Sequence, residues 1–382
     1  MIYLDNSATT KPRQSVTDEY VRAAHELWIN PSAAYAQALD SEKALDHARR
    51  SILRSVGGTS IGSVVFTGGG TEGDNLAIMG TCYARARTMH HLVTDAVEHP
   101  AVSRSCEFLE KNGWRLTTLP VTEQGVVDPA AVAEAVCGDT AIVSIMHINN
   151  ETGAVNDVRA IAEAVKAKNP KTLVHVDAVQ AYLRVPIDLS KTKIDLYSAS
   201  GHKIHGPKGV GFLFVRRGVT LDGVALGGGQ EMGLRSGTLN TPGILALERA
   251  VLDWDDADIA RVRQIKEALY REVCARVDGV RRNGPDKETA APHILNLGFS
   301  GVRAETLLHA LEERDILVAT GSACSSRHRR VSFVLDAMHV PEEYLTGSIR
   351  LSFGIFNTMD EVVPAAEAIA ECVTLLRRFK AR

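Results

Sequence analysis

The chain has 382 residues, of which 45% are hydrophobic and 23% are charged, and its formal net charge at pH 7 is −3. These values are typical of a globular protein with a large core, and the length corresponds to about two or three domains. The slightly negative charge argues against a nucleic-acid-binding protein, since such proteins carry excess positive charge. The start of the chain lacks a signal-peptide pattern, and no apolar run is long enough to span a membrane. We therefore expect a cytoplasmic protein with no membrane contact.

The six cysteines are scattered along the chain and form no closely spaced pair; they are Cys82, Cys106, Cys137, Cys274, Cys324 and Cys372. This spacing fits neither a zinc ribbon nor a dense disulfide framework. The sequence therefore predicts that most of the thiols are buried or free, and it predicts no metal site.

Short apolar segments alternate with amphipathic ones between residues 63 and 215. Seven segments rich in β-branched and apolar residues are predicted strands: Ser63–Thr67, His91–Asp95, Arg115–Leu119, Ala141–Met146, Thr172–Asp177, Ile194–Ala199 and Val210–Val215. Helical patterns lie between several of them, at Thr71–Ala84, Ala101–Asn112, Pro129–Val136 and Asp157–Ala167. Repeated strand–helix units imply right-handed crossovers, so we predict an α/β fold whose mostly parallel, seven-stranded sheet is covered on both faces.

The pattern changes after about Gly243, where a long charged helical stretch is predicted to run to about Val277. An apolar PHILNLGF segment follows, then a predicted helix at Ala304–Arg314, a strand at Ile316–Val318 and the apolar SIRLSF segment. The last predicted element is one amphipathic helix at Asp360–Lys380. These elements are typical of a smaller α+β unit.

The change in pattern predicts two closely packed domains. We assign residues 12–250 to a large α/β domain and residues 251–382 to a small α+β domain, with residues 1–11 packing against the small one.

A glycine-rich turn, Thr67-Gly-Gly-Gly-Thr-Glu-Gly-Asp-Asn75, follows the first predicted strand and opens a helix. Glycines let the backbone approach an anion, and the free N–H groups at a helix start favour a phosphate. Gly68 and Gly73 have the spacing of a Walker loop, but Asp74 stands where that loop requires lysine. By itself the turn fits a plain connection as well as it fits a phosphate site.

An aspartate and a lysine follow two later strands. Asp177 ends the predicted strand Thr172–Asp177, and Lys203 follows the next strand in the segment SASGHKIHGPKG. In open α/β sheets ligands bind at the carboxyl ends of strands, so Asp177, Lys203 and Thr71 are expected to converge on one crevice. Considered alone, Asp177 fits a structural role as a strand-end cap, and Lys203 fits an ordinary surface lysine. Together with a phosphate cradle they are what pyridoxal phosphate requires: a lysine that holds the cofactor and an acid that keeps its pyridine nitrogen protonated.

Seven motifs in chain order carry a resemblance to a known family: FTGGGTEGDN, VEHPAV, MHINNETG, HVDAVQ, SGHKIHGPKG, LRSGT and GSACSS. Together they resemble the NifS/IscS cysteine desulfurases, which belong to the class-V aminotransferase group of fold-type-I pyridoxal-phosphate enzymes. The matches run from YLDNSATT at the start to SIRLSFG near the end, so the resemblance covers nearly the whole chain. It implies a homodimer that acts on L-cysteine and passes sulfur to an acceptor protein, either an iron–sulfur scaffold or a sulfur carrier.

The resemblance also implies roles for individual residues. Lys203 carries the cofactor, His99 stacks on its pyridine ring and moves protons, and Asp177 pairs with the pyridine nitrogen. The residues that hold the phosphate are Gly70, Thr71, Ser200 and His202. Gln180 contacts the phenolic oxygen of the ring. Thr238 reaches the phosphate of the other subunit. Asn150 contacts both cofactor and substrate, and the guanidinium fork of Arg350 suits the substrate's carboxylate.

Cys324 is surrounded by small and hydroxyl residues and is followed by the basic run Arg327–Arg330. Nearby positive charge favours the thiolate, which is the nucleophile. The resemblance implies that Cys324 takes the sulfur of L-cysteine as a persulfide, leaving L-alanine, and delivers it to iron–sulfur cluster or thio-cofactor synthesis. The long stretch from Cys324 to Phe333 resembles the family branch with an extended catalytic loop. Arg327–Arg330 fits a solvated loop face better than a site that steers an acidic acceptor.

Two other functions remain open. A relative that acts on selenocysteine or cysteine sulfinate is disfavoured by the GSAC segment, and substrate competition distinguishes it. A catalytically silent scaffold for a sulfur acceptor is disfavoured because Lys203, Asp177, His99 and Cys324 are all present.

Overall fold

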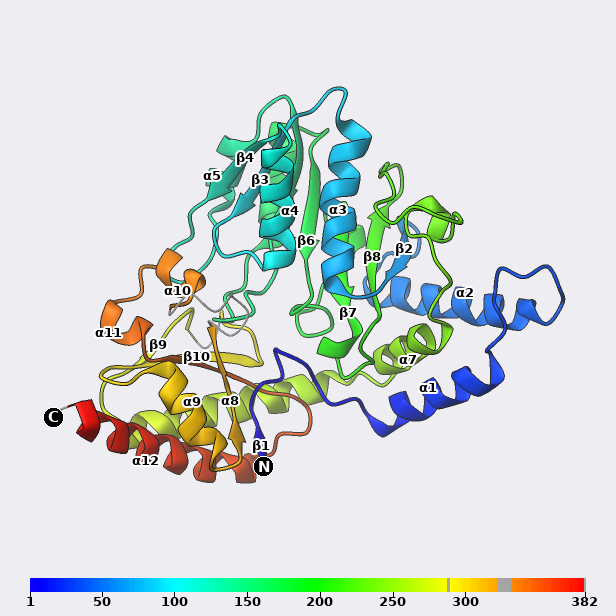
Figure 1. The fold of residues 1–382 in the computed structure, drawn as a ribbon. Helices are drawn as coiled ribbons and strands as arrows, with labels where there is room; N and C mark the ends of the chain where they lie inside the picture. Colours follow the sequence, from blue (N-terminus) through cyan, green and yellow to red (C-terminus); the bar gives the residue numbers. More distant parts are fainter. Residues whose placement is uncertain (287–288, 322–330, 381–382) are drawn as a thin grey trace.

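The structure, a computed structural model, describes residues 1–286, 289–321 and 331–380 (Figure 1). Its largest sheet has seven strands in the order β2-β8-β7-β6-β5-β3-β4. The bounds are β2 Gly62–Thr67, β3 His91–Asp95, β4 Arg115–Leu119, β5 Thr140–Ser144, β6 Leu173–Asp177, β7 Leu196–Ser200 and β8 Gly211–Arg216. Only β8 runs antiparallel to its neighbours, β2 and β7, while the other pairings in this sheet are parallel. The predicted mostly parallel, seven-stranded sheet is therefore confirmed.

The two faces of this sheet bury two separate cores, because successive side chains of a strand point to opposite sides. On β2, Val65 lies in the core beneath helices α3 (Gly70–Arg85) and α4 (Pro100–Lys111), which stand side by side on one face (Figure 1). Val64 and Phe66 lie in the core on the other face. The helices on that second face are α1 Gln14–Glu26, α2 Ala38–Ser55, α5 Pro129–Ala135, α6 Val158–Lys168 and α7 Thr241–Leu252. Full burial of such valine and phenylalanine side chains stabilises the fold by roughly 2 kcal/mol each.

Two crossover helices begin at aspartate N-caps, a residue type that the sequence alone marks as a helix start. Asp128 accepts a hydrogen bond from the backbone N–H of Ala130 at the start of α5, at 2.9 Å. Asp157 caps α6 in the same way through Ala160, at 3.0 Å. Such caps satisfy N–H groups that have no partner inside the helix. Helices α1 and α2, which complete the second core, were not predicted.

The prediction of one long helix between Gly243 and Val277 is wrong. The structure has two helices there, α7 and α8 (Asp256–Arg276), with a break at residues 253–255. The carboxylate of Asp255 accepts from the backbone N–H of Ala257 at 2.8 Å and so starts a new helix. The charge pattern did not reveal the break because the aspartates on both sides suit a helix surface as well as a cap.

A second, four-stranded sheet lies in the C-terminal part of the chain, in the order β12-β13-β10-β9, and all its pairings are antiparallel. The strands are β9 Val280–Arg282, β10 Ile294–Phe299, β12 Ala319–Thr320 and β13 Ser348–Ser352. Helices α8, α9 (Ala304–Glu312) and α12 (Val362–Lys380) share its apolar core, and α10 (Phe333–Ala337) and α11 (Glu342–Leu345) lie between β12 and β13 in sequence. The strand β1 (Ile2–Tyr3) pairs in parallel with β11 (Ile316–Leu317).

The large sheet and the C-terminal sheet have separate apolar cores, and Leu4 belongs to the C-terminal one. The division into two domains at residues 250 and 251, with residues 1–11 packing against the small domain, stays a prediction. Val334 and Leu335 of α10 instead join the core of the large sheet, so the two parts share elements.

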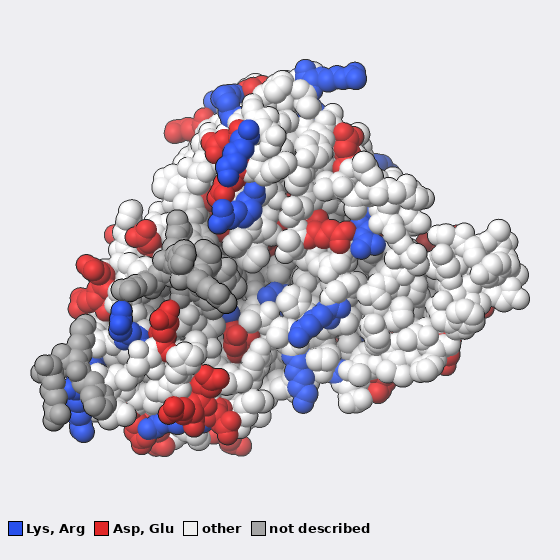
Figure 2. All heavy atoms as spheres, in the orientation of Figure 1, with Lys and Arg blue, Asp and Glu red and all other residues white. Residues whose placement is uncertain are grey.

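On the face drawn in Figure 2 acidic and basic side chains are interspersed. None of the helices in the described ranges combines the length and apolar character needed to cross a bilayer.

Candidate active site

A cavity of about 310 Å³ lies at the carboxyl ends of the central strands, where an open α/β sheet binds ligands. Its lining comes from the N-terminal segment, the glycine-rich turn, the carboxyl ends of β6 and β7, and Arg350 in the middle of β13. The predicted site residues that line it are Gly70, Thr71, His99, Asn150, Asp177, Gln180, Ser200, His202, Lys203 and Arg350. The tertiary structure therefore gathers ten residues predicted from separate motifs around one space.

Lys203 lies in a short 3-10 turn, Gly201–Lys203, directly after β7. Its Nζ donates hydrogen bonds to the backbone carbonyl oxygens of Ser7, at 2.6 Å, and Ala8, at 2.8 Å. The guanidinium of Arg184 donates to the carbonyl oxygen of Lys203 itself. Ser7, Ala8 and Arg184 were not predicted, because nothing in their local sequence marks them as neighbours of Lys203.

Asp177 is the last residue of β6 and is 6% exposed. Its Oδ1 accepts from the backbone N–H of Val179 at 2.9 Å. Burial raises the pKa of the Asp177 carboxyl, while the nearby His99, the Val179 N–H and Lys203 oppose that rise. A buried carboxylate of this kind is stabilised by a positive charge placed beside it, such as a protonated pyridine nitrogen.

His99 caps helix α4, and its Nδ1 accepts from the backbone N–H of Ala101 at 3.1 Å. Pro100 at the first helical position fits this start, since proline has no N–H to satisfy. Burial lowers the pKa of His99, which favours the neutral ring, although Asp177 acts in the opposite direction. Because Nδ1 accepts, the proton of the neutral ring lies on Nε2.

The glycine-rich turn opens α3 beside Ser200 and His202, where these residues line a second cavity of about 530 Å³. Gly69 has a φ of 151°, a backbone conformation that residues with a side chain rarely adopt. A Cβ on Gly70 would lie 2.3 Å from Cγ2 of Val179, so only glycine fits there. The backbone N–H groups at the start of this 16-residue helix and the Thr71 hydroxyl suit a phosphate. The pKa of His202 is lowered to about 4 by burial and by nearby lysines, which favours the neutral ring.

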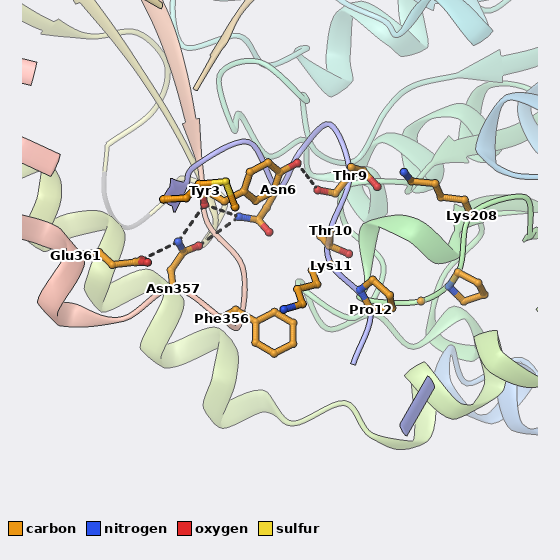
Figure 3. Close-up of a pocket in the computed structure, with 13 residues that line it drawn as sticks. Tyr3, Asn6, Thr9, Thr10, Lys11, Pro12, Lys208, Phe356, Asn357 and Glu361 are labelled. Atoms are coloured by element: carbon orange, nitrogen blue, oxygen red, sulfur yellow. Dashed lines mark hydrogen bonds between the residues drawn. The ribbon is translucent and has the colours of Figure 1, made fainter. Parts of the chain in front are cut away.

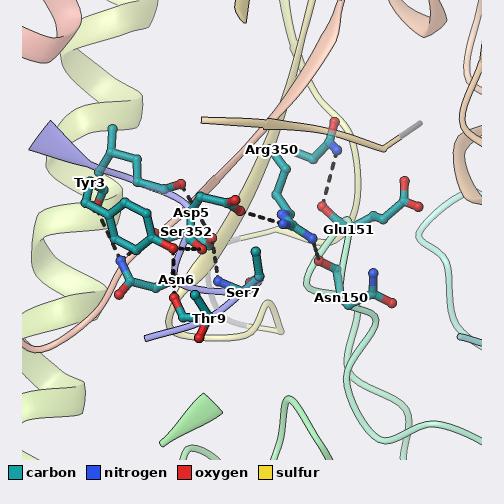
Figure 4. A network of polar contacts seen from close by, with 12 residues as sticks. Tyr3, Asp5, Asn6, Ser7, Thr9, Asn150, Glu151, Arg350 and Ser352 are labelled. Carbon is teal, nitrogen blue, oxygen red and sulfur yellow. Dashed lines mark hydrogen bonds and ion pairs between the residues drawn. The ribbon is translucent and has the colours of Figure 1, made fainter. Parts of the chain in front are cut away.

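Arg350 lies on β13 and is 8% exposed (Figure 4). Its Nη2 pairs with Oδ1 of Asp5 at 2.6 Å, and its Nη1 donates to the carbonyl oxygen of Asn150 at 2.9 Å. Its buried Nε has no hydrogen-bond partner among the described residues. The guanidinium is therefore fixed in direction and keeps donor capacity for a further group. Asp5 is another residue that sequence reasoning missed.

Gln180 is held on both ends of its side-chain amide. Nε2 donates to the carbonyl oxygen of Ser7 at 3.0 Å, and Oε1 bonds to Nε2 of His293 at 3.2 Å. The orientation of Gln180 is thus set by the N-terminal segment and by a residue of the C-terminal part.

A further buried carboxyl, Asp74 on α3, lies behind Asp177. Asp74 accepts a hydrogen bond from the Ser198 hydroxyl and is 3.6 Å from Nε2 of His175. Burial and the neighbouring Asp177 raise the pKa of Asp74 well above its usual range. Two buried acids at one end of the cavity favour a cation there. The sequence analysis used Asp74 only to exclude a Walker loop.

A larger cavity of about 730 Å³ lies next to the N-terminal segment (Figure 3). It shares Thr9 and Lys208 with the cavity at the glycine-rich turn. Its wall is braced by Asn357, whose Nδ2 donates to the carbonyl oxygen of Tyr3 at 3.0 Å and to Glu361 at 2.9 Å. The N-terminal segment therefore separates this space from the cavity that contains Lys203.

Comparison with known proteins identifies the family of the chain. Residues 2–363 match the aminotransferase class-V family model. The chain belongs to the class-V aminotransferase family. It is similar to cysteine desulfurase IscS of Dictyoglomus turgidum, with 37% identity over 380 residues that cover 98% of this chain and 95% of the relative. This full-length similarity shows that the class-V aminotransferase described here is a cysteine desulfurase, an enzyme that uses pyridoxal phosphate.

Two solved structures are similar to this cysteine desulfurase. One is described as a NifS-like protein, with a TM-score of 0.91 and 32% identity, covering 98% of this chain and 99% of that one. The other is described as SspA in complex with cysteine, with a TM-score of 0.82 and 30% identity, covering 94% of this chain and 100% of that one. The predicted fold class is thereby confirmed.

The residues around the cavity fit the cofactor of this family. Gly70 leaves room where a Cβ would close the space at the helix start, and the buried Asp177 and Asp74 favour a cationic ring nitrogen. Lys203 Nζ reaches the same cavity. Lys203, Asp177 and the turn around Gly70 and Thr71 are therefore the residues that would hold pyridoxal phosphate.

Two predicted residues are not in this group. Thr238 is exposed and is not among the residues that line the cavity, and its contact with another subunit stays a prediction. Cys324 lies outside the described residues, as do Arg327–Arg330.

Proposed function

We propose that this cysteine desulfurase transfers the sulfur of L-cysteine to Cys324 and releases L-alanine. The observation that carries the proposal is the single cavity that combines Lys203, Asp177 and His99 with Arg350 and Asn150. The first three residue types are those that an amino-acid-activating cofactor needs, and the last two suit the carboxylate of an amino acid.

Pyridoxal phosphate, when bound, withdraws electrons from the α-carbon of an amino acid. This chain's residues hold and orient the reactants. Lys203 binds the cofactor through Nζ, and the carboxylate of Asp177 stabilises positive charge at the ring nitrogen. His99 keeps its proton on Nε2 because Nδ1 accepts from Ala101, so it presents a donor from a fixed position. The backbone at Gly70 and the Thr71 hydroxyl hold the phosphate.

Arg350 and Asn150 bind the substrate in this proposal. The ion pair with Asp5 and the bond to the Asn150 carbonyl set the plane of the guanidinium before the substrate arrives. A fixed guanidinium reduces the entropy lost on binding a carboxylate. We expect the Arg350 fork to orient the α-carbon of L-cysteine toward Lys203.

Sulfur transfer forms one bond and breaks one. The thiolate of Cys324 attacks the substrate's Sγ to form a sulfur–sulfur bond, and the substrate's Cβ–Sγ bond breaks, with its electron pair remaining on the carbon. That fragment takes up a proton and leaves as L-alanine, so no external oxidant is needed. None of the five described cysteines lines the cavity, which favours Cys324 as the acceptor. Burial also raises the pKa of Cys82 to about 12, so that thiol is a poor nucleophile.

The persulfide passes to an acceptor protein for iron–sulfur cluster or thio-cofactor synthesis. The enzyme acts as a homodimer in which Thr238 reaches the phosphate site of the partner copy; the same loop exposes Leu226 (85%) and Met232 (63%), which a partner would cover. The enzyme works in the cytoplasm, away from membranes and nucleic acids.

The test is an assay of the purified, cofactor-loaded protein with L-cysteine and a reductant, following sulfide and alanine together. Equal amounts of both products, lost in Cys324→Ser with cofactor absorbance retained, support the proposal. Sulfide at the wild-type rate from Cys324→Ser would refute sulfur transfer to Cys324. Faster turnover of selenocysteine or cysteine sulfinate in direct competition would replace L-cysteine as the substrate.

A further inference from the structure

Glu151 has no part in the function proposed above, although it follows Asn150 directly and lies beside Arg350 (Figure 4). Its side chain is buried, and the whole residue is 4% exposed. Burial raises the pKa of the Glu151 carboxyl to about 7, while the Ser332 hydroxyl and Arg350 oppose that rise. A buried carboxyl next to the proposed substrate site needs partners, and its partners come from a distant part of the chain.

Ser332 is the first of these partners. Its hydroxyl donates a hydrogen bond to Oε2 of Glu151 at 2.5 Å, across 181 positions of sequence. The same hydroxyl oxygen accepts from the backbone N–H of Leu335 at 3.2 Å and so caps helix α10. One hydroxyl therefore links Glu151 to the start of a helix that is packed on the core of the large sheet.

Gly321 is the second partner. A Cβ built on Gly321 would lie 2.2 Å from Oε2 of Glu151 and 2.8 Å from Cβ of Ser332. Backbone and carboxylate therefore approach so closely that only glycine fits. Gly321 follows β12, in which Ala319 pairs with Arg350. One carboxylate oxygen thus contacts the chain on both sides of residues 322–330, the segment that contains Cys324.

We propose that Glu151 is a positioning residue for sulfur transfer, because it fixes the two points at which the segment carrying Cys324 joins the fold. The inference rests on the proposed role of Cys324. Glu151 is adjacent in sequence to Asn150, whose carbonyl oxygen binds Arg350. The loop that contains Glu151 and Asn150 therefore fixes the positions of Gly321 and Ser332 relative to the substrate-binding residues. The geometry of attack on Sγ depends on that registration, since small displacements of reacting groups reduce rates steeply.

The test compares Glu151→Ala, Glu151→Gln, Gly321→Ala and the double variant Glu151→Ala/Gly321→Ala, each loaded with cofactor. The first readout is the rate of tryptic cleavage after Arg327, Arg329 and Arg330, followed by mass spectrometry. The second is kcat and KM for alanine formation from L-cysteine. Glu123→Ala, which removes an exposed carboxylate elsewhere, is the matched control.

We expect Glu151→Ala to speed tryptic cleavage and to lower kcat, each by about tenfold, with cofactor absorbance and KM unchanged. Glu151→Gln retains an oxygen that accepts from Ser332 and should recover most of both losses. Gly321→Ala should resemble Glu151→Ala, because the added methyl group displaces the same oxygen. In the double variant the contact with Glu151 is gone but the 2.8 Å approach to Cβ of Ser332 remains, so its loss should exceed that of Glu151→Ala yet stay below the product of the two single losses.

Wild-type cleavage and kcat in Glu151→Ala would overturn the proposal. So would a rise in KM with kcat unchanged, which would assign Glu151 to substrate binding through Arg350. Multiplicative losses in the double variant would show that Glu151 and Gly321 act independently. If Glu151→Ala fails to bind cofactor, Gly321→Ala decides, since it keeps the buried carboxyl. Absence of alanine from the wild type would refute the proposed function, whereas the cleavage rates would still test Glu151.

Discussion

The side-chain amine of Lys203 lies 2.6 Å from the carbonyl oxygen of Ser7, a residue 196 positions away in the chain. This contact and the one to Ala8 hold Nζ at the edge of the cavity that also contains Asp177 and His99. Nζ is the atom through which Lys203 would hold pyridoxal phosphate, so the contacts to Ser7 and Ala8 would keep the amine at the cavity until the cofactor is bound. The N-terminal segment therefore contributes to the site in two ways, because it contacts the lysine through Ser7 and Ala8 and pairs with Arg350 through Asp5.

Replacing Lys203 with alanine should prevent covalent attachment of the cofactor. Reduction with borohydride followed by mass spectrometry should find one cofactor mass on the peptide containing Lys203 in the wild type and none in Lys203→Ala. Lys193→Ala, which removes an exposed lysine, should label like the wild type. Labelling of another peptide in Lys203→Ala at the wild-type level would contradict the assignment.

Replacing Asp177 with asparagine should lower kcat by about a hundredfold or more, because the neutral amide no longer stabilises positive charge at the ring nitrogen. The buried volume is nearly unchanged, so the fold and the cavity should persist. Circular dichroism and cofactor absorbance check the structure, and single-turnover alanine formation gives the rate. Turnover within twofold of the wild type would remove Asp177 from the proposed site.

Replacing Gly70 with alanine should weaken cofactor binding, because the new Cβ would lie 2.3 Å from Cγ2 of Val179 and displace the phosphate-binding turn. A loss of about tenfold in affinity is expected, measured by cofactor titration of the apoprotein. Gly138→Ala is the control, since nothing lies within 4 Å of its built Cβ.

Val179→Ala should recover part of the loss caused by Gly70→Ala, because it removes the atom that the new methyl group meets. Equal affinities for Gly70→Ala and the wild type would show that the turn does not hold the phosphate.

The stability of the protein should depend on the ionisation of Glu151. Its pKa rises from the ordinary 4.5 to about 7 in the fold, so the folded state favours the neutral carboxyl. Relative to Glu151→Gln, the wild type should therefore lose stability as the pH rises from about 4.5 through about 7, by roughly 3 kcal/mol in total, and then level off. Denaturant unfolding over that pH range measures the difference. A difference that is constant with pH, or that grows in the opposite direction, would contradict the buried-carboxyl interpretation.

The order and type of most elements were predictable from local pattern. The strand predicted at His91–Asp95 coincides with β3, because a buried strand of a parallel sheet forms a short apolar, β-branched run. The strand predicted at Arg115–Leu119 coincides with β4, a partly exposed edge strand. That Asp177 and Lys203 line one cavity was also predictable, since Asp177 ends one strand and Lys203 follows the next, at the end where such sheets bind ligands. The break between α7 and α8 was not predictable, because Asp255 suits the surface of a helix and its cap equally well.

The sequence by itself determined the α/β pattern, the motifs and the residue types that pyridoxal phosphate requires, because periodicity and motif spacing are properties of contiguous residues. Only the tertiary structure decided which distant residues complete the site. Asp5 reaches Arg350 across 345 positions, and Glu151 reaches Ser332 across 181. Such contacts depend on how the N-terminal segment and the second sheet pack on the first, and that packing is set by the whole buried surface rather than by any local pattern.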